Sequence, residues 1–171
     1  MAKTPSPPLL VAADTNVPLD LADEREVVWD AWTTIRARLP GCVLMLPPTV
    51  ARELAFIAEA GDTPQDRAAA RKVFQRHREW GFRLASFIPL GSNLVAQVAE
   101  RIRAKGMLPP SEVNDSLILA ESAALSAAFL LTSDEHLRGI DLQQLTLVLQ
   151  SFDLRVPVVT TPSEVVRKFF R

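Results

Sequence analysis

The stretch Leu9-Leu10-Val11-Ala12-Ala13-Asp14-Thr15-Asn16 is an apolar run that ends abruptly in a carboxylate, a hydroxyl and an amide. A strand buried on both faces of a parallel sheet has this continuous aliphatic character. Open α/β sheets bind ligands beyond the carboxyl ends of such strands, which makes Asp14 a candidate site residue. Taken alone, Asp14 fits equally well a residue that caps a turn or the next helix. The rest of the chain repeats the pattern, and this repetition favours a site.

Short apolar runs alternate with segments of helical spacing along the chain. The apolar runs predict strands over residues 9–13, 42–46, 127–131 and 156–159. The last strand is expected at a sheet edge because Pro157 has no N–H to donate, and residues 83–89 form either a strand or a loop. This alternation predicts an α/β fold, a doubly wound, mostly parallel sheet of four to five strands with helices on both faces.

The helical segments are separated by Pro and Gly residues. Apolar spacing predicts helices over residues 19–39, 49–61, 65–80, 93–105 and 111–126. Ser111 is the expected N-cap of the 111–126 helix, and a last short helix opens at Thr161-Pro162-Ser163-Glu164. Residues 141–152 fit both a helical stripe and an alternating strand, and we favour the helix.

Composition limits the class of protein. The chain has 171 residues, of which 48% are hydrophobic and 23% charged, as in an ordinary soluble globular protein. Residues 1–8 are expected to be a loose lead-in without the h-region of a signal peptide, and residues 9–171 a single domain. No apolar run reaches the roughly 18 residues of a membrane span. With a single cysteine, Cys42, the chain cannot form an internal disulfide, so a cytoplasmic location is expected.

The net charge of −1 makes the whole chain a weak attractor of polyanions, but the charge is unevenly distributed. Residues 65–105 carry nine basic and three acidic side chains, whereas the first 64 residues carry five basic and nine acidic ones. A basic segment beside an acidic one suits a polyanion that binds near clustered carboxylates. The alternative is a solvated helix face. The candidate polyanion-binding residues on the 65–80 helix are Arg67, Arg71, Lys72 and Arg76.

Four carboxylates follow predicted strands or open predicted helices: Asp14, Glu53, Asp115 and Asp134. Strand C-termini and helix N-termini share one edge of a doubly wound sheet, so all four are expected to meet there. Clustered carboxylates repel one another, and a folded protein tolerates them best when a cation lies between them. Oxygen ligands without a Cys/His set favour a hard ion, Mg²⁺ or Mn²⁺. Singly, each carboxylate is explained equally well as a cap or a surface charge.

This arrangement suits metal-assisted hydrolysis of a phosphodiester, in which one ion, or two, would activate water and neutralise charge on the phosphoryl oxygens. Side chains beside the carboxylates would orient them or the substrate: Thr15, Asn16, Asn114, Thr132 and Ser133. Glu112 is explained either as an outer ligand or as a first-turn acid. His136 is a possible proton carrier that we expect to face away from the site.

The chain resembles the PIN-domain nucleases, among them the VapC-like toxins of toxin–antitoxin pairs. The resemblance covers about residues 9–169 and rests on motifs in a fixed order: Asp14-Thr15-Asn16, Ala51-Arg52-Glu53-Leu54, Asn114-Asp115, Thr132-Ser133-Asp134 and Val156-Pro157-Val158-Val159-Thr160-Thr161-Pro162. It implies a three-layer α/β/α fold, Mg²⁺- or Mn²⁺-dependent endoribonuclease activity on RNA, homodimers and, for a toxin, a small antitoxin partner. The four carboxylates match the family's acidic positions. The chain is longer than the compact toxins, partly through residues 141–154, and this weakens the toxin assignment more than the nuclease assignment.

Two other functions stay open. In a haloacid-dehalogenase-type phosphatase Asp14 would be the nucleophile, but that chemistry requires a second Asp at position 16, where this chain has Asn16. A PIN-like module that binds RNA or protein without cutting is the non-enzymatic alternative, and it gives no reason for an intact set of four carboxylates. Three tryptophans are candidates for base stacking, although their spacing favours burial: Trp29, Trp32 and Trp80.

Overall fold

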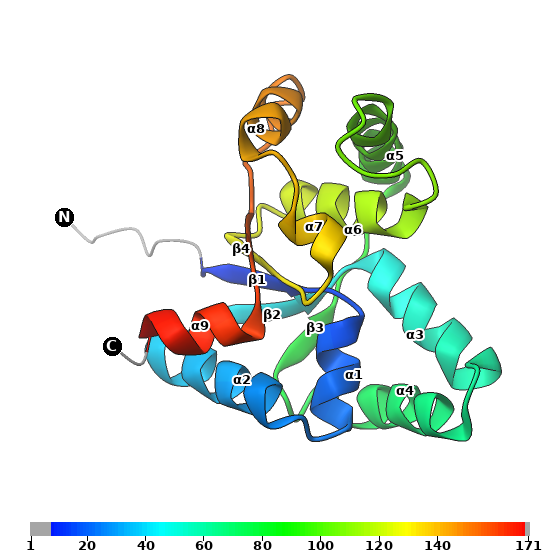
Figure 1. Cartoon of the computed structure of the whole chain (residues 1–171), viewed down its shortest axis with the longest axis vertical. Helices are drawn as coiled ribbons and strands as arrows, with labels where there is room; N and C mark the ends of the chain where they lie inside the picture. The colour runs from blue at the N-terminus through cyan, green and yellow to red at the C-terminus, as the bar shows by residue number, and fades with distance from the viewer. Residues whose placement is uncertain (1–7, 170–171) are drawn as a thin grey trace.

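The computed structural model describes residues 8–169, which contain a five-stranded, all-parallel sheet (Figure 1). The strands are β1 (Leu10–Ala13), β2 (Val43–Leu46), β3 (Phe82–Leu84), β4 (Phe129–Leu131) and β5 (Val158–Thr160). Their order across the sheet is β3-β2-β1-β4-β5, which confirms the predicted α/β class and the edge position of the last strand. Apart from Pro8, the predicted lead-in lies outside the described residues.

The central strand β1 sets the position of the site. Its residues pair with β2 on one side and with β4 on the other, with Ala13 opposite Leu131. The backbone N–H of Asp14 continues this pairing by donating to the carbonyl of Leu131 at 2.9 Å. The chain builds β2 and β3 on one side of β1 and then crosses to build β4 and β5 on the other. This reversal of strand order leaves a crevice beyond the carboxyl ends of β1 and β4, where open α/β sheets bind ligands.

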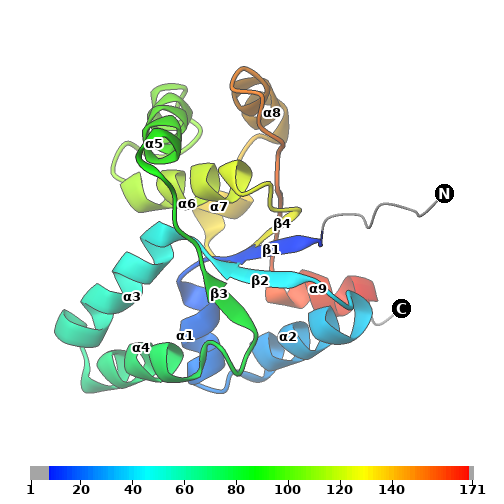
Figure 2. The ribbon, with the colours of Figure 1, turned by 180° about the vertical axis from the view of Figure 1, so that it is seen from behind.

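Helices cover both faces of the sheet, as predicted (Figures 1 and 2). On one face lie α1 (Asn16–Ala22), α2 (Glu26–Arg38), α4 (Pro64–Arg76) and α9 (Pro162–Phe169), and on the other lie α5 (Pro89–Ala104), α6 (Val113–Ala124) and α8 (Leu142–Gln150). The helix α3 (Pro48–Ala60) extends from the carboxyl end of β2 and packs against both α4 and α6. A short helix, α7 (Glu135–Arg138), follows β4. Within residues 8–169, no helix combines the length and apolar character needed to cross a membrane.

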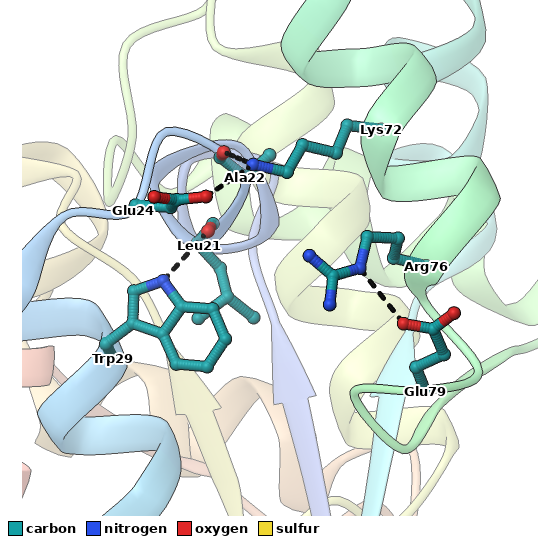
Figure 3. A network of polar contacts seen from close by, with 7 residues as sticks. All are labelled: Leu21, Ala22, Glu24, Trp29, Lys72, Arg76 and Glu79. Atoms are coloured by element: carbon teal, nitrogen blue, oxygen red, sulfur yellow. Dashed lines mark hydrogen bonds and ion pairs between the residues drawn. The ribbon is translucent and has the colours of Figure 1, made fainter.

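The predicted helix 19–39 is wrong in one respect, because the structure divides this region into α1 and α2. Glu24 adopts a left-handed conformation with φ of 59°, and the N–H of Arg25 donates to the carbonyl of Asp20 at 2.9 Å. Lys72 stabilises the break from α4, since its Nζ donates to the carbonyl of Ala22 at 2.7 Å and to Glu24 at 2.9 Å (Figure 3). The break depends on this tertiary contact, whereas the apolar spacing of the sequence continues through it.

Other boundaries also differ from the prediction. Ser111 is not the N-cap of α6; Glu112 occupies that position, because residues 109–112 form a turn in which the N–H of Glu112 donates to the carbonyl of Pro109. The helix α4 ends at Arg76, earlier than predicted, and α5 begins earlier, at Pro89, a residue well suited to a first helical turn. The ambiguous segments resolve into β3 and α8, and the favoured helix over residues 141–152 is thereby confirmed.

Candidate functional site

The four predicted carboxylates lie around one cavity at the carboxyl edge of the sheet, with a volume of about 530 Å³. They come from the end of β1, the second turn of α3, the first turn of α6 and the residue before α7. The cavity is lined by Asp14, Thr15, Asn16, Leu19, Thr49, Arg52, Glu53, Phe56, Ile57, Asn114, Asp115 and Asp134. The structure thus brings together residues that are up to 120 positions apart in the sequence.

Asp14 is the most deeply buried of the four, with 4% of its surface exposed. Its carboxylate accepts hydrogen bonds from the N–H of Thr15 at 2.6 Å, from Nδ2 of Asn16 at 2.7 Å and from Oγ1 of Thr132 at 2.6 Å. Burial raises the pKa of Asp14, the hydrogen bonds from Thr132 and Thr15 oppose this, and nearby carboxylates add to the rise. Asp14 is therefore fixed in orientation by neutral donors.

The loop after β4 is tied to the end of β1 through Asn16 and Thr132. Asn16 Oδ1 accepts from the N–H of Ser133 at 3.1 Å, and Thr132 Oγ1 accepts from the N–H of Asp134 at 2.9 Å. Asp134 in turn caps α7, since its Oδ1 accepts from the N–H of Leu137 at 3.0 Å. Asp134 thus serves as a helix cap and also lines the cavity.

Glu53 connects three elements across the cavity. Its Oε1 accepts from Nδ2 of Asn114, the residue before Asp115, at 2.7 Å. Its Oε2 accepts from the hydroxyl of Thr15, the residue after Asp14. The side chains of Thr15 and Asn114 therefore hold the carboxylate of Glu53, while the backbone N–H of Thr15 holds Asp14.

Asp115 has a strongly raised pKa. Burial, together with the negative charges of Asp134, Asp14, Glu112 and Glu53, raises its pKa to about 7. A cation among these oxygens would relieve the repulsion. The four cavity carboxylates are hard oxygen donors without a thiolate among them, so the residues present fit Mg²⁺ or Mn²⁺.

Glu112 and His136 lie beside Asp115. Among residues 8–169, Glu112, Asp115 and His136 form the group whose potential ligand atoms all lie within 4.8 Å of one another. His136 Nδ1 is 3.8 Å from Glu112 Oε1, so the imidazole faces the start of α6. His136 is not among the residues that line the cavity, in agreement with the expectation that it faces away from the site, although its ring lies near Asp115.

Sequence reasoning missed Glu121, a carboxylate in the middle of α6 that is only 3% exposed. Its two oxygens accept from the N–H of Thr49 at 3.0 Å and from the Thr49 hydroxyl at 2.8 Å, and Arg52 donates to the same hydroxyl at 2.7 Å. Burial raises the pKa of Glu121, and the hydrogen bonds from Thr49 oppose the rise. Glu121 thereby caps the N-terminus of α3 and fixes the helix that carries Glu53. A lone acidic residue within a long apolar stretch was the available signal.

The predicted polyanion-binding residues of α4 do not line the cavity. Arg67 donates to the carbonyl of Gly61, Arg71 donates to that of Ala58 at 3.1 Å, and both contacts hold the end of α3. Lys72 stabilises the α1–α2 break, and Arg76 Nε is 3.0 Å from Glu79 (Figure 3). These contacts give the basic residues structural roles, and their contact with a polyanion stays a prediction.

Comparisons with known proteins find similarity in structure and none in sequence. No family model matches the chain, and no curated protein matches it. Among solved structures, VapBC2 from Rickettsia felis bound to a DNA fragment from their promoter matches with a TM-score of 0.60 and 11% identity, over 90% of this chain and 98% of the matched chain. VapBC-1 from nontypeable Haemophilus influenzae matches with a TM-score of 0.58 and 14% identity, over 91% and 99%. At the level of the fold, these similarities confirm the predicted resemblance to VapC-like PIN domains.

Proposed function

We propose that this protein is a metal-dependent endoribonuclease that hydrolyses RNA phosphodiester bonds at the acidic cavity. The supporting observation is the convergence of four carboxylates on one cavity, where burial and the neighbouring negative charges raise the pKa of Asp115 to about 7. Such perturbation in a cleft is typical of functional sites. In this proposal Asp14, Asp115 and Asp134 hold Mg²⁺ or Mn²⁺, and Glu53 completes the set.

A bound divalent ion supplies a Lewis acid that lowers the pKa of water and neutralises charge on the phosphoryl oxygens. The contribution of the protein is the fixed geometry of its oxygen donors. Asn16 and Thr132 orient Asp14 through hydrogen bonds of 2.7 and 2.6 Å, and Asn114 and Thr15 orient Glu53. These neutral donors position the carboxylates without adding a positive charge that would compete with a bound cation.

The phosphatase alternative loses support from the contacts of Asn16. Its amide nitrogen donates to Asp14 and its oxygen accepts from the N–H of Ser133. An amide in this position has no proton to give to a leaving group at ordinary pH, whereas the phosphatase chemistry requires an acid there. A non-cutting binding module remains the competing outcome of the experiment below.

We infer that residues 9–171 act as one cytoplasmic domain, that the chain forms homodimers and that it pairs with a small antitoxin protein. The support is that both similar structures are VapBC structures. Light scattering of the purified chain, with and without the product of a small neighbouring reading frame, tests both associations. A monomer that does not bind this product would contradict them.

The decisive experiment measures cleavage of a labelled single-stranded RNA with Mg²⁺, with Mn²⁺ and with excess chelator. We expect cleavage only with the ions, and none above the chelator background for Asp14→Asn, Glu53→Gln, Asp115→Asn or Asp134→Asn. Asp30→Asn on the exposed side of α2 is the matched control and should keep full activity. Asn16→Ala should lower the rate by about 10- to 100-fold, as loss of a ligand-orienting residue does.

Two results would overturn the proposal. Equal cleavage in excess chelator would remove the metal from the mechanism, and full activity of the carboxylate variants would remove the site. If the wild-type protein binds RNA but cuts none with either divalent ion, the binding-module function is correct instead. Circular dichroism of each variant shows whether a loss of activity reflects loss of the fold.

A further inference from the structure

One wall of the acidic cavity is apolar and is formed by Leu19 of α1 with Phe56 and Ile57 of α3. Phe56 is the aromatic residue among those that line the cavity, and 68% of its surface is exposed. Ligand-binding cavities typically combine apolar and aromatic walls with a few polar groups, and Phe56 with Leu19 and Ile57 gives this cavity such a wall. Phe56 is not part of the hydrophobic core, so core packing does not explain its position at the cavity.

The position of Phe56 on α3 relates it directly to the carboxylates. Residues three and four apart on a helix share a face, so Phe56 lies one turn beyond Glu53 and Arg52. Glu53 is tied to the ends of β1 and α6 by its hydrogen bonds, which fixes this face of α3 toward the cavity. A ligand that reaches the carboxylates therefore passes within one helical turn of an exposed ring.

The tryptophans that the sequence offered for stacking are occupied elsewhere. Trp29 and Trp32 pack edge to face with their ring centres 5.0 Å apart, and Trp29 packs likewise on Trp80 at 6.4 Å. The indole nitrogens of Trp29 and Trp32 donate to the backbone carbonyls of Leu21 and Trp80. Trp29 and Trp32 on α2 are partly buried against the fully buried Trp80, which supports the structural interpretation of these residues and leaves Phe56 as the aromatic group among the residues that line the cavity.

We propose that Phe56 stacks on an unpaired base of the bound RNA, next to the phosphodiester at the carboxylates. This inference rests on the proposed function, since the base and the phosphate belong to the same stretch of polynucleotide. The cavity volume of about 530 Å³ lies within the range of sites that hold small molecules. Arg52, exposed on the same face of α3, supplies positive charge near the backbone of the RNA.

Stacking on a phenyl ring has two consequences for substrate choice. Every base has a π face, so the subsite tolerates all four bases and does not specify a sequence at that position. A base inside a duplex has both faces covered by its neighbours and must leave the stack before it can reach the ring. Phe56 therefore favours cleavage within unpaired segments over cleavage within helices.

The test compares Phe56→Ala and Phe56→Trp with wild-type protein, first in binding and then in cleavage. Binding of a fluorescent single-stranded RNA is measured by anisotropy in chelator, where cleavage does not interfere. We expect Phe56→Ala to weaken binding by about 10-fold, which is typical of the loss of one stacked base, and Phe56→Trp to retain it. Leu147→Ala, which alters a residue 64% exposed on α8 and away from the cavity, is the control and should bind normally.

An abasic scan then identifies the base. Removing the bases near the scissile bond one at a time should slow wild-type cleavage at one position, and Phe56→Ala should show no further loss at that position. Unchanged RNA binding and unchanged cleavage by Phe56→Ala would overturn the inference and assign the exposed ring to a protein partner. If wild-type protein cuts no RNA yet Phe56→Ala weakens binding, the nuclease proposal fails and the stacking subsite stands.

Discussion

The cavity and the α3–α4 contact are both crowded with like charges, but they differ in what surrounds those charges. In the cavity, Asp14 and Glu53 are held by neutral donors, namely hydroxyls, amides and a backbone N–H. Along α4, the basic side chains donate to backbone carbonyls, and Lys72 and Arg76 also pair with glutamates. Within residues 8–169, none of the four cavity carboxylates lies within 4.0 Å of a basic side-chain nitrogen.

This difference separates a structural use of charge from a functional one. The cations of α4 are satisfied by the protein itself, so their clustering needs no ligand. Burial and the neighbouring carboxylates raise the pKa of Asp14 and of Asp115, and within residues 8–169 none of the four cavity carboxylates has an ion-pair partner. Such an arrangement is destabilising unless something outside the chain supplies the positive charge.

Glu121 sharpens the comparison because it is a buried carboxylate next to the cavity that has its own partners. Replacing it by alanine would leave the N–H and the hydroxyl of Thr49 buried without an acceptor. We expect Glu121→Ala to lower the free energy of unfolding by about 3 kcal/mol, given the cost of unsatisfied buried donors and a lost helix cap. Urea denaturation followed by circular dichroism measures this change.

Glu121→Gln and Glu59→Ala complete that experiment. Glutamine keeps one acceptor oxygen, so its effect should be smaller than that of alanine. Glu59 is exposed near the end of α3, and its replacement should change stability by less than about 0.5 kcal/mol. If Glu121→Ala were as stable as wild type, Glu121 would not cap α3, and the contrast between Glu121 and the cavity carboxylates would be lost.

The sequence predicted four of the five strands and the convergence of the four carboxylates, because both follow from local pattern and from the geometry of parallel sheets. Asp14 and Asp134 follow apolar strands, and Asp115 opens a helix, so a single sheet edge gathers them. The role of Glu121 could not be predicted, because its partner Thr49 is 72 positions away. The break at Glu24 was missed for the same reason, since Lys72 stabilises it from another helix.

The exposed Phe56 shows a different limit of sequence reasoning. Its apolar character gave no reason to separate it from the core residues of α3, such as Val50 and Leu54, which are fully buried. Likewise, the basic residues of α4 form a conspicuous cluster in the sequence, and only the three-dimensional contacts show how each is used. The sequence shows where charged residues cluster, but only the structure shows which of them pair with other groups of the protein.

The pH dependence of stability tests the repulsion in the cavity. Asp115 has a pKa of about 7 in the folded protein against 3.8 ordinarily, so the folded state binds more protons between these values. The free energy of unfolding of the metal-free protein should therefore fall as the pH rises from about 4 to about 7. At pH 8 we expect metal-free Asp115→Asn to be more stable than wild type by about 1–2 kcal/mol, after allowance for solvent screening at this half-buried group.

Comparing the free energies of unfolding of wild type and Asp115→Asn across this pH range separates the contribution of Asp115 from that of the other titrating groups. The advantage of Asp115→Asn should shrink as the pH falls toward 4 and vanish below the ordinary pKa of 3.8, where the wild-type carboxyl is protonated in both states. Adding Mn²⁺ at pH 8 should stabilise wild type and reverse the order, since a ligand that binds the folded state raises stability. A wild-type protein that matches Asp115→Asn at every pH would show that the cavity carboxylates do not repel one another.

Lys72 tests the basic residues of α4, and its replacement should change the free energy of unfolding least. Lys72→Met keeps most of the side-chain stem but removes the hydrogen bonds to Ala22 and Glu24. Because the ammonium is partly exposed, we expect a loss of about 0.5–1 kcal/mol in the free energy of unfolding, with RNA cleavage unchanged. Lys105→Met, at the exposed end of α5, is the matched control and should change stability less. If Lys72→Met instead kept full stability and weakened RNA binding, the basic residues of α4 would serve the ligand, and the distinction between the two regions would fail.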